Sequence, residues 1–318
     1  MKLGVSHQAP EDLNNRRFDF LLGLGVEAIE VRLLSHEATR EKLEEIKSTV
    51  DSSGLGLHEI MLNDLYNSTS AALSLPEAES DIERMKSFIT DLGELGIPHT
   101  TYAWHTGGMY ETHRDETRGV PTRGFSTELA NAAPNTFERK FSEDELWQSY
   151  DVFLREVLPV ARQANVKLQL HPNDPPMDHQ GIPRIFKSTE AFQRAMAMAD
   201  QSPYSGILFC VGTWAGMSGR DGQGEDVIAA LREFGAGGQI HQVHMRNITS
   251  PLPNFVETFP DGGYLNLHSI MDVLVEIGFD GMIVPDHVPG EGDNAMLINE
   301  AYTLGYLRAL IQYAQHQS

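Results

Sequence analysis

Residues 166–176 read VKLQLHPNDPP, a short apolar run that ends in a histidine and is stopped by prolines and polar residues. The same pattern recurs further along the chain, in GILFCVGT at 206–213, IHQVHMRN at 240–247 and GMIVPDHVPG at 281–290. Apolar runs of four to eight residues bounded by turn signals are typical of strands buried on both faces, as in a parallel sheet. The four segments therefore predict four parallel strands, each ending in a reactive side chain.

Four earlier runs of the same kind bring the number of predicted strands to eight. The eight ranges are Lys2–Ser6, Ala28–Leu33, Gly56–Leu62, His99–Trp104, Val166–His171, Gly206–Val211, Ile240–Met245 and Gly281–Pro285. Helical patterns separate them, and parallel strands need such crossover helices. Eight alternating units predict an α/β fold, a (β/α)₈ TIM barrel. The alternative is an open doubly wound sheet, which is disfavoured because GVSHQAPEDL at 4–13 lacks a glycine-rich phosphate loop.

Several helix boundaries can also be predicted. Leu43, Ile46 and Val50 follow helical spacing, and we expect Ser35 to cap that helix and Gly54 to end it. Ser142 with Glu145 predicts a capping box, Ser188 is a second N-cap candidate, and 299–315 is the predicted last helix.

We expect residues 1–318 to form one barrel domain, because α/β barrels fill such lengths as single units. One connection is unusually long. Residues 105–141, rich in Gly, Thr, Arg and Asn, are predicted to be a loop inserted after the fourth strand. Loops of this length are usually lids or binding loops, and this one leaves the end of the barrel where active sites lie.

Composition limits the partners. The net charge is −21, with 24 Lys and Arg against 45 Asp and Glu, which disfavours nucleic acid and anionic membranes. The single cysteine forms no internal disulfide and fits a reducing compartment, and no signal-peptide pattern or long apolar run is seen. We expect a cytoplasmic homo-oligomer with a small-molecule substrate.

The ends of the last four strands offer a metal-binding set: His171, Cys210, His244 and Asp286. A lone buried cysteine or strand-end histidine usually has only a packing role. Four such residues on successive strands of one barrel converge at one end, which favours a single divalent ion. The donors suit Mn²⁺, Fe²⁺, Co²⁺ or Zn²⁺, whereas Mg²⁺ prefers an all-oxygen shell. Mn²⁺ is the ion we favour.

The motifs HPNDPP (171–176), GIPRIF (181–186), FCVGT (209–213), VHMRN (243–247) and PDH (285–287) together resemble the D-mannonate dehydratase family. The resemblance covers roughly the second half of the chain. It implies a metal-dependent barrel that removes water from a six-carbon sugar acid to give a 2-keto-3-deoxy acid. The metal ligands that it implies fall on the same four residues.

The sequence departs from the family pattern at two positions. Asn173 stands where HPDDPP is usual, and Ala301 stands where the catalytic tyrosine is expected, with Tyr302 next to it. We therefore expect His287 and Tyr302 to share the acid and base roles of the reaction.

Four further residues are predicted to bind the substrate. Arg246 could hold its carboxylate in a bidentate manner, or could form a strand-end salt bridge. Arg118 and Arg123 on the long loop could close over an anion, although a solvated loop is equally in keeping with them. Asp174 could orient His171 or contact a metal-bound water, or could simply be a turn residue.

Two other functions fit a metal-binding barrel. A sugar isomerase or epimerase of the xylose-isomerase-like barrels would use carboxylate-rich strand ends, and Glu59 near the end of the third strand keeps it open. A barrel that binds a metal or sugar acid without turnover would tolerate Ala301, but has no need of a titratable His287. Endonuclease-like barrels with several zinc ions are disfavoured by the net charge.

Overall fold

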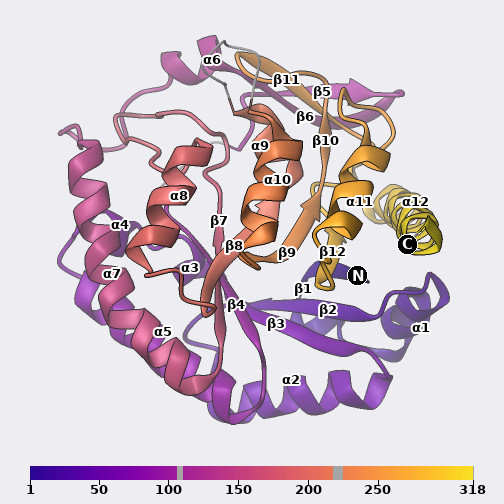
Figure 1. Ribbon diagram of the computed structural model, residues 1–318, viewed down its shortest axis with the longest axis horizontal. Helices are drawn as coiled ribbons and strands as arrows, with labels where there is room; N and C mark the ends of the chain where they lie inside the picture. The colour runs from indigo at the N-terminus through magenta and orange to yellow at the C-terminus, as the bar shows by residue number, and fades with distance from the viewer. Residues whose placement is uncertain (106–109, 218–224, 318) are drawn as a thin grey trace.

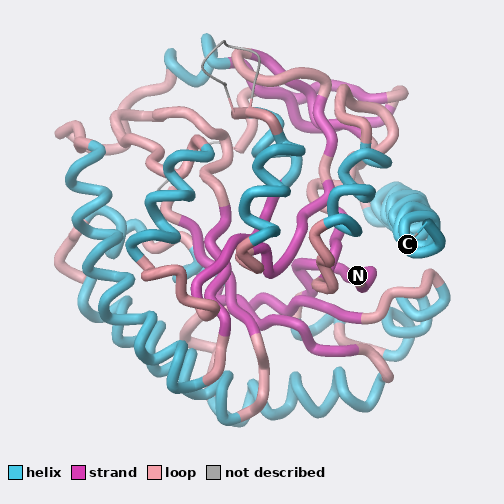
Figure 2. The backbone as a smooth tube through the Cα atoms, viewed as in Figure 1, coloured by secondary structure: helices cyan, strands magenta, loops and turns pink. Residues whose placement is uncertain are grey.

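The structure is a computed structural model that describes residues 1–105, 110–217 and 225–317. Eight parallel strands close into a barrel in the order β1-β12-β9-β8-β7-β4-β3-β2, surrounded by helices (Figures 1 and 2). The barrel strands are β1 Lys2–Gln8, β2 Ala28–Leu33, β3 Gly56–Leu62, β4 His99–Ala103, β7 Lys167–His171, β8 Ser205–Cys210, β9 Ile240–Met245 and β12 Met282–Pro285. The predicted TIM barrel is thus confirmed, and each predicted strand overlaps an observed one.

Strand register brings the predicted ligands to one end of the barrel. Cys210 on β8 is the register partner of His244 on β9, and His244 in turn pairs with Val284 on β12. Asp286 follows β12 directly, and His171 is the last residue of β7. Because neighbouring parallel strands end at the same edge of the barrel, all four side chains lie at its carboxyl end.

Helices cover the outside of the barrel. The longer ones are α1 Asn15–Gly23, α2 Arg40–Ser53, α5 Ala78–Glu94, α7 Glu143–Ala164, α8 Thr189–Met198, α10 Val227–Ala236, α11 Leu267–Glu276 and α12 Asp293–Gln317. The shorter ones are α3 Asn63–Tyr66, α4 Thr69–Leu73, α6 Thr127–Ala132 and α9 Val211–Gly216. Among the described residues, none of these helices is both long and apolar enough to cross a bilayer.

Most of the predicted helix ends are confirmed. Ser142 and Glu145 form the capping box of α7, Ser188 caps α8, and Gly54 ends α2 in a left-handed conformation. The predicted cap of α2 was wrong. Thr39 accepts the backbone N–H of Lys42 there, whereas the hydroxyl of Ser35 donates to Asp64.

The segment predicted as a loop after β4 carries structure of its own. It contains the antiparallel strands β5 His113–Thr117 and β6 Val120–Ser126, followed by α6; residues 106–109 lie outside the described residues. β6 also pairs with β11 Asn254–Thr258, which pairs with β10 Asn247–Ile248 in the connection after β9. A small four-stranded sheet therefore links two insertions beside the barrel (Figure 1).

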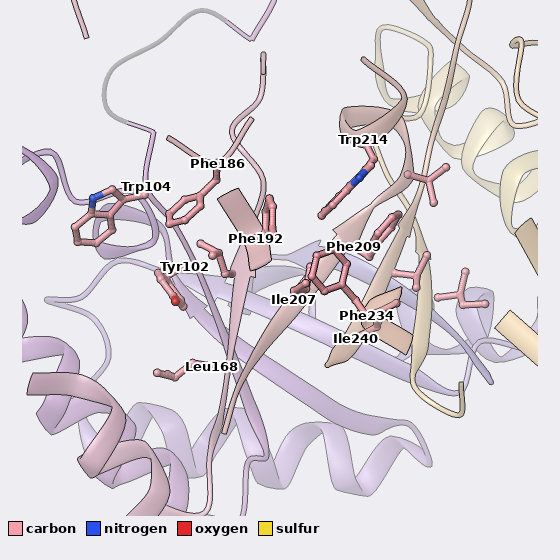
Figure 3. Close-up of a cluster of buried hydrophobic side chains, with 14 of the residues drawn as sticks. Tyr102, Trp104, Leu168, Phe186, Phe192, Ile207, Phe209, Trp214, Phe234 and Ile240 are labelled. Atoms are coloured by element: carbon pink, nitrogen blue, oxygen red, sulfur yellow. The ribbon is translucent and has the colours of Figure 1, made fainter. Parts of the chain in front are cut away.

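The apolar core lies between the barrel strands and the helices around them. Figure 3 shows a part of it in which Phe209 of β8 stacks on Trp214 of α9, with ring centroids 4.2 Å apart, and Phe192 of α8 packs against the same indole at 4.6 Å. Burial of such side chains contributes roughly 1.5–3 kcal/mol each. This packing fixes the ends of β8 and α9, between which Cys210 lies.

Candidate active site

A cavity of about 940 Å³ opens at the carboxyl end of the barrel. Residues from β1, β2, β7, β9, β12 and the hairpin β5–β6 line it, among them His7, Arg32, Arg123, His171, His244 and His287. Its volume is typical of small-molecule sites. Most of the predicted site residues lie in this cavity or directly beneath it.

Three of the predicted metal ligands form a compact group. One ligand atom each from His171, Cys210 and His244 lies within 4.8 Å of the other two, and all three residues are buried. Asp286 lies against two of them: its Oδ2 accepts from the Cys210 thiol at 3.3 Å, and its Oδ1 lies 3.5 Å from Nδ1 of His244. The structure thus brings the four predicted residues together.

The free atoms of this group fit a metal ion. Nδ1 of His171 donates to the carbonyl of Pro172 at 2.7 Å, which leaves its Nε2 with a free lone pair. The amide nitrogen of Gln242 lies 3.3 Å from Nε2 of His244, and Oδ1 of Asp286 lies 3.5 Å from its Nδ1, which makes no hydrogen bond among the described residues. Coordination through Nδ1 would require the tautomer of His244 that carries its proton on Nε2.

Burial and neighbouring side chains shift the pKa values of this group. Burial, and then the charge of Asp286, raises the pKa of the Cys210 thiol above its ordinary value. Burial and the neighbouring His244 lower the pKa of His171 to about 3, so its ring is neutral and able to coordinate. Burial alone would raise the pKa of Asp286, but the charges around it, with His287 the largest, hold it well below the ordinary value.

Arg246 is a buried residue beneath the cavity that bonds several neighbouring side chains. Its guanidinium bonds Asp174 (2.8 Å), Glu257 (2.6 Å) and the hydroxyl of Thr213 (2.8 Å), and lies 3.4 Å from Asp286. Although burial opposes it, these carboxylates raise the pKa of Arg246 well above its ordinary value. Both Nη atoms of Arg246 are engaged by protein groups, and the side chain does not line the cavity. The structure therefore places Arg246 in the salt-bridge alternative and not in the predicted bidentate contact with substrate.

His287 lies at the cavity wall between a carboxylate and an arginine. Its Nδ1 lies 2.8 Å from Oε1 of Glu257, and its Nε2 lies 3.2 Å from Nη1 of Arg123. The same Glu257 oxygen also accepts from Arg246, whose Nη1 lies 2.5 Å from Nδ1. In the tautomer that fits the contacts with Glu257 and Arg123, Nδ1–H donates to Glu257, and Nε2 accepts from Arg123 at the cavity wall.

The comparisons with known proteins agree with this geometry. The model of the family described as D-mannonate dehydratase (UxuA) matches residues 126–317. A mannonate dehydratase of Oceanobacillus iheyensis is 30% identical over 313 residues, covering 86% of this chain and 85% of that protein. One from Thermotoga petrophila is 28% identical over 316 residues, covering 85% of this chain and 86% of that protein.

The chain belongs to the D-mannonate dehydratase family. The match to the family model falls mainly in the second half of the chain, where the sequence motifs lie. Among solved structures, the mannonate dehydratase from Streptococcus suis serotype 2 has a TM-score of 0.86 at 22% identity, covering 100% of this chain and 95% of that one. The 3-keto-D-glucoside 4-epimerase YcjR from E. coli has a TM-score of 0.67 at 15% identity, covering 97% and 99%. At these identities the structural likenesses show the fold alone.

The structure does not bring Tyr302 and Arg118 into the cavity. Tyr302 lies on α12, is 42% exposed, and donates to Asp261 at 2.8 Å. Arg118 lies at the turn of the β5–β6 hairpin, where it bonds the same Asp261 and the Tyr302 hydroxyl. Their predicted catalytic and substrate-binding roles are therefore replaced by a polar cluster outside the cavity.

Two further expectations need correction. Asp174 lines the cavity but does not orient His171, which is held by the carbonyl of Pro172. Glu59 lies within β3, accepts from Gln169 at 2.9 Å inside the barrel, and does not line the cavity. At the family departure, the side-chain oxygen of Asn173 accepts the backbone N–H of Phe186 at 2.7 Å, a contact that an aspartate would also make, so the structure does not explain the departure.

Sequence reasoning missed His7, Glu257 and the pair Arg17–Glu300, all of which line the cavity. His7 follows the strand-end pattern, since it lies near the end of β1 and its ring packs edge-on against His244 at 6.3 Å. Glu257 lies in an insertion that carries no strand-end motif. Glu300 is the residue before Ala301, and Arg17 holds it with two hydrogen bonds.

Proposed function

We propose that this protein is a metal-dependent hydro-lyase that removes water from D-mannonate or a closely related hexonate to give a 2-keto-3-deoxy acid. The observation that carries the proposal is the meeting of His171, Cys210 and His244 with Asp286 in one cavity of a chain that belongs to the D-mannonate dehydratase family. His287 and Arg123, from two other elements, lie in the same cavity.

We propose His171, Cys210, His244 and Asp286 as the ligands of one divalent ion, with Mn²⁺ as the favoured metal. When bound, such an ion stabilises the negative charge that develops on the substrate as a proton leaves the carbon next to the carboxylate. Cys210 would hold the ion as a thiolate, so metal binding would be accompanied by release of the thiol proton. Softer metals should depend more on Cys210 than Mg²⁺ does.

His287 is the proposed base that takes the C2 proton. Its Nε2 faces the cavity, and the carboxylate of Glu257 holds the opposite nitrogen. When His287 gains the proton, this buried carboxylate stabilises the imidazolium. Glu257 is suited to the role because, although burial alone would raise its pKa, its interactions with His287 and Arg246 lower it and keep the group ionised.

Arg123 is the proposed receptor for the substrate carboxylate. Arg17, Arg32 and Arg114 also line the cavity, but each has a carboxylate partner within the protein. Among the described residues, no ion pair to a carboxylate is seen for Arg123, which leaves its planar group available for an anion. Its contact with His287 would place the carboxylate beside the base, and Asp174 is proposed to contact a substrate hydroxyl.

An anaerobic assay of the Mn²⁺-loaded protein against hexonates and pentonates tests the proposal, with 2-keto-3-deoxy acid as the readout. Product from D-mannonate or a close relative supports it. Firm metal binding without product from any acid would contradict it, and would favour a sugar isomerase or epimerase, to be tested by proton exchange with solvent. A barrel that only binds would show neither product nor exchange.

We further propose that the protein acts in the cytoplasm as a homo-oligomer. The lone buried cysteine as a metal ligand suits a reducing compartment. Light scattering of the purified protein tests the second part, and a monomer at working concentration would contradict it.

A further inference from the structure

Loss of a hydroxyl from carbon needs a proton donor, and the family tyrosine position is Ala301 in this chain. Tyr302 does not supply the proton, because it lies outside the cavity in a cluster with Asp261 and Arg118. The cavity-lining residue next to Ala301 is Glu300, whose two oxygens are engaged by Arg17. The acid must therefore come from another part of the cavity wall.

Tyr110, which precedes β5, lines the same cavity as His171 and Asp174. Its hydroxyl oxygen lies 2.9 Å from Nε2 of His105, the residue that follows the end of β4 by two positions. His105 is buried, and its ring packs edge-on toward His171 with centroids 6.4 Å apart. A phenol backed by a buried imidazole thus reaches the cavity beside the proposed metal ligands.

We propose, on the basis of the proposed function, that Tyr110 is the catalytic acid that protonates the departing C3 hydroxyl. His105 holds the phenol in position for this step. In this chain the Tyr110–His105 pair would supply the acid, because Ala301 stands where the family resemblance predicts a tyrosine in the last helix.

The hydrogen-bond pattern of His105 favours this direction of transfer. Among the described residues, which leave out 106–109, Nδ1 of His105 is buried without a hydrogen-bond partner, and an unpaired lone pair there is less costly than an unpaired N–H. The proton of the neutral ring therefore belongs on Nε2, from which it donates to the phenol oxygen. The phenol hydrogen is then free for the substrate, and the Nε2–H bond stabilises the phenolate that remains.

The protonation state of Tyr110 suits an acid. Tyr110 is 38% exposed as a whole, but partial burial, and then the charge of Asp174, raises the pKa of its phenol, which therefore carries its proton at neutral pH. Tyr66 also lines the cavity, but its ring packs against His105 and His171, and no imidazole lies within hydrogen-bond distance of its hydroxyl among the described residues. Tyr110 is therefore the better candidate of the two.

The proposed step balances in protons and electrons. His287 takes the C2 proton, the C2–H electron pair forms the C2–C3 double bond, and the C3–O bond breaks as its oxygen takes the phenol proton and leaves as water. The enol then becomes the ketone: C3 takes the proton held by His287, and the enol hydroxyl releases one proton that restores Tyr110. No oxidant or reductant is needed.

The experiment compares Tyr110→Phe with the matched variant Tyr302→Phe in the Mn²⁺-loaded protein. Three rates are measured: keto acid formation from the best hexonate, exchange of its C2 proton with D₂O, and fluoride release from its 3-deoxy-3-fluoro analogue. Fluoride leaves without protonation, so its release does not need the acid. We expect Tyr110→Phe to lose about 10²- to 10⁴-fold in keto acid formation while C2 exchange, fluoride release and metal content remain, and Tyr302→Phe to match the wild type.

Two results would overturn the assignment while the proposed function stands. Tyr110→Phe could form keto acid at the rate of the wild type, or it could lose exchange and fluoride release together with dehydration, which would mean that the hydroxyl serves binding or folding. Failure of the proposed function looks different, because the wild type itself would then form no keto acid from any hexonate, and the Tyr110 assignment would fall with it.

Discussion

The two ends of the barrel each gather histidines, yet in opposite surroundings. At the carboxyl end, carboxylates lie within ion-pair distance: Asp286 beside His244 and Glu257 beside His287. At the amino end, His58, His99 and His241 line a second cavity of about 670 Å³ together with Lys2 and Lys167. There the rings of His58 and His99 stack on each other at 4.2 Å, and no carboxylate of the described chain pairs with any of the three.

The contrast shows that surroundings, not residue type, decide what these imidazoles do. His241 and His244 lie three residues apart on β9. Burial lowers the pKa of His241 to about 3 and that of His99 to about 4, so both stay neutral packing groups. At the other end the buried carboxylates and thiol supply the negative charge that a divalent ion requires.

The largest difference between the ends should appear in metal binding. His244→Ala removes a proposed ligand and leaves Asp286 and Cys210 without their neighbour, so we expect loss of stoichiometric Mn²⁺ and of all turnover. His241→Ala, on the same strand, is the matched control and should keep both. Metal analysis of the two purified variants measures this, and an equal metal content in both would contradict a metal site that is confined to the carboxyl end.

Removing His287 should separate turnover from metal binding. We expect His287→Ala to keep its metal while dehydration and C2 proton exchange fall by about 10²- to 10⁴-fold, because the proposed base is gone. Turnover, exchange with D₂O and metal content are measured on one preparation. If the metal leaves together with the activity, His287 is instead a ligand or a structural residue.

Arg123 and Arg118 both lie on the β5–β6 hairpin, but their removal should affect substrate binding differently. Arg123→Ala should raise KM for a hexonate by about 10- to 100-fold, the loss expected when a charged hydrogen bond of about 1.5–3 kcal/mol is removed. Arg118→Ala should leave KM unchanged, because Arg118 bonds Asp261 outside the cavity. Steady-state kinetics decide this, and an increase confined to Arg118→Ala would reverse the assignment.

The smallest predicted effect concerns acid stability at the amino end. The pKa of His99 is lowered to about 4 from an ordinary value of 6.5, so the folded state disfavours its protonation. The stabilisation is present above pH 6.5 and is lost as the pH falls from 6.5 towards 4. His99→Gln should therefore flatten the fall of Tm over that range in metal-free protein. An unchanged slope would show that His99 does not contribute.

The fold, and the meeting of the four proposed ligands at one end of the barrel, were accessible from the sequence because each depends on local pattern. The eight apolar runs fix the strands, and parallel closure then places His171, Cys210, His244 and Asp286 at one end. The same strand-end rule would have found His7, had it been applied to β1 as it was to the later strands.

The cavity walls could not be predicted, because they depend on pairing between distant insertions. Arg123 faces the cavity and Arg118 does not, a difference that arises only when β5 and β6 pair. Glu257 reaches His287 because β11 pairs with β6. The sequences of the two insertions that contain these strands do not predict this pairing. On α12 each residue turns the side chain by about 100°, so Tyr302, two residues after Glu300, lies on nearly the opposite face and does not line the cavity, whereas Glu300 does.

The central claim is that one end of the barrel, and not the other, holds the metal. A crystal of the Mn²⁺-loaded protein, with data collected at the manganese edge, tests it most directly. The account predicts one anomalous peak within about 2.0–2.4 Å of His171, Cys210, His244 and Asp286. A peak among His58, His99 and His241, or a peak at the carboxyl end without these ligands, would contradict it.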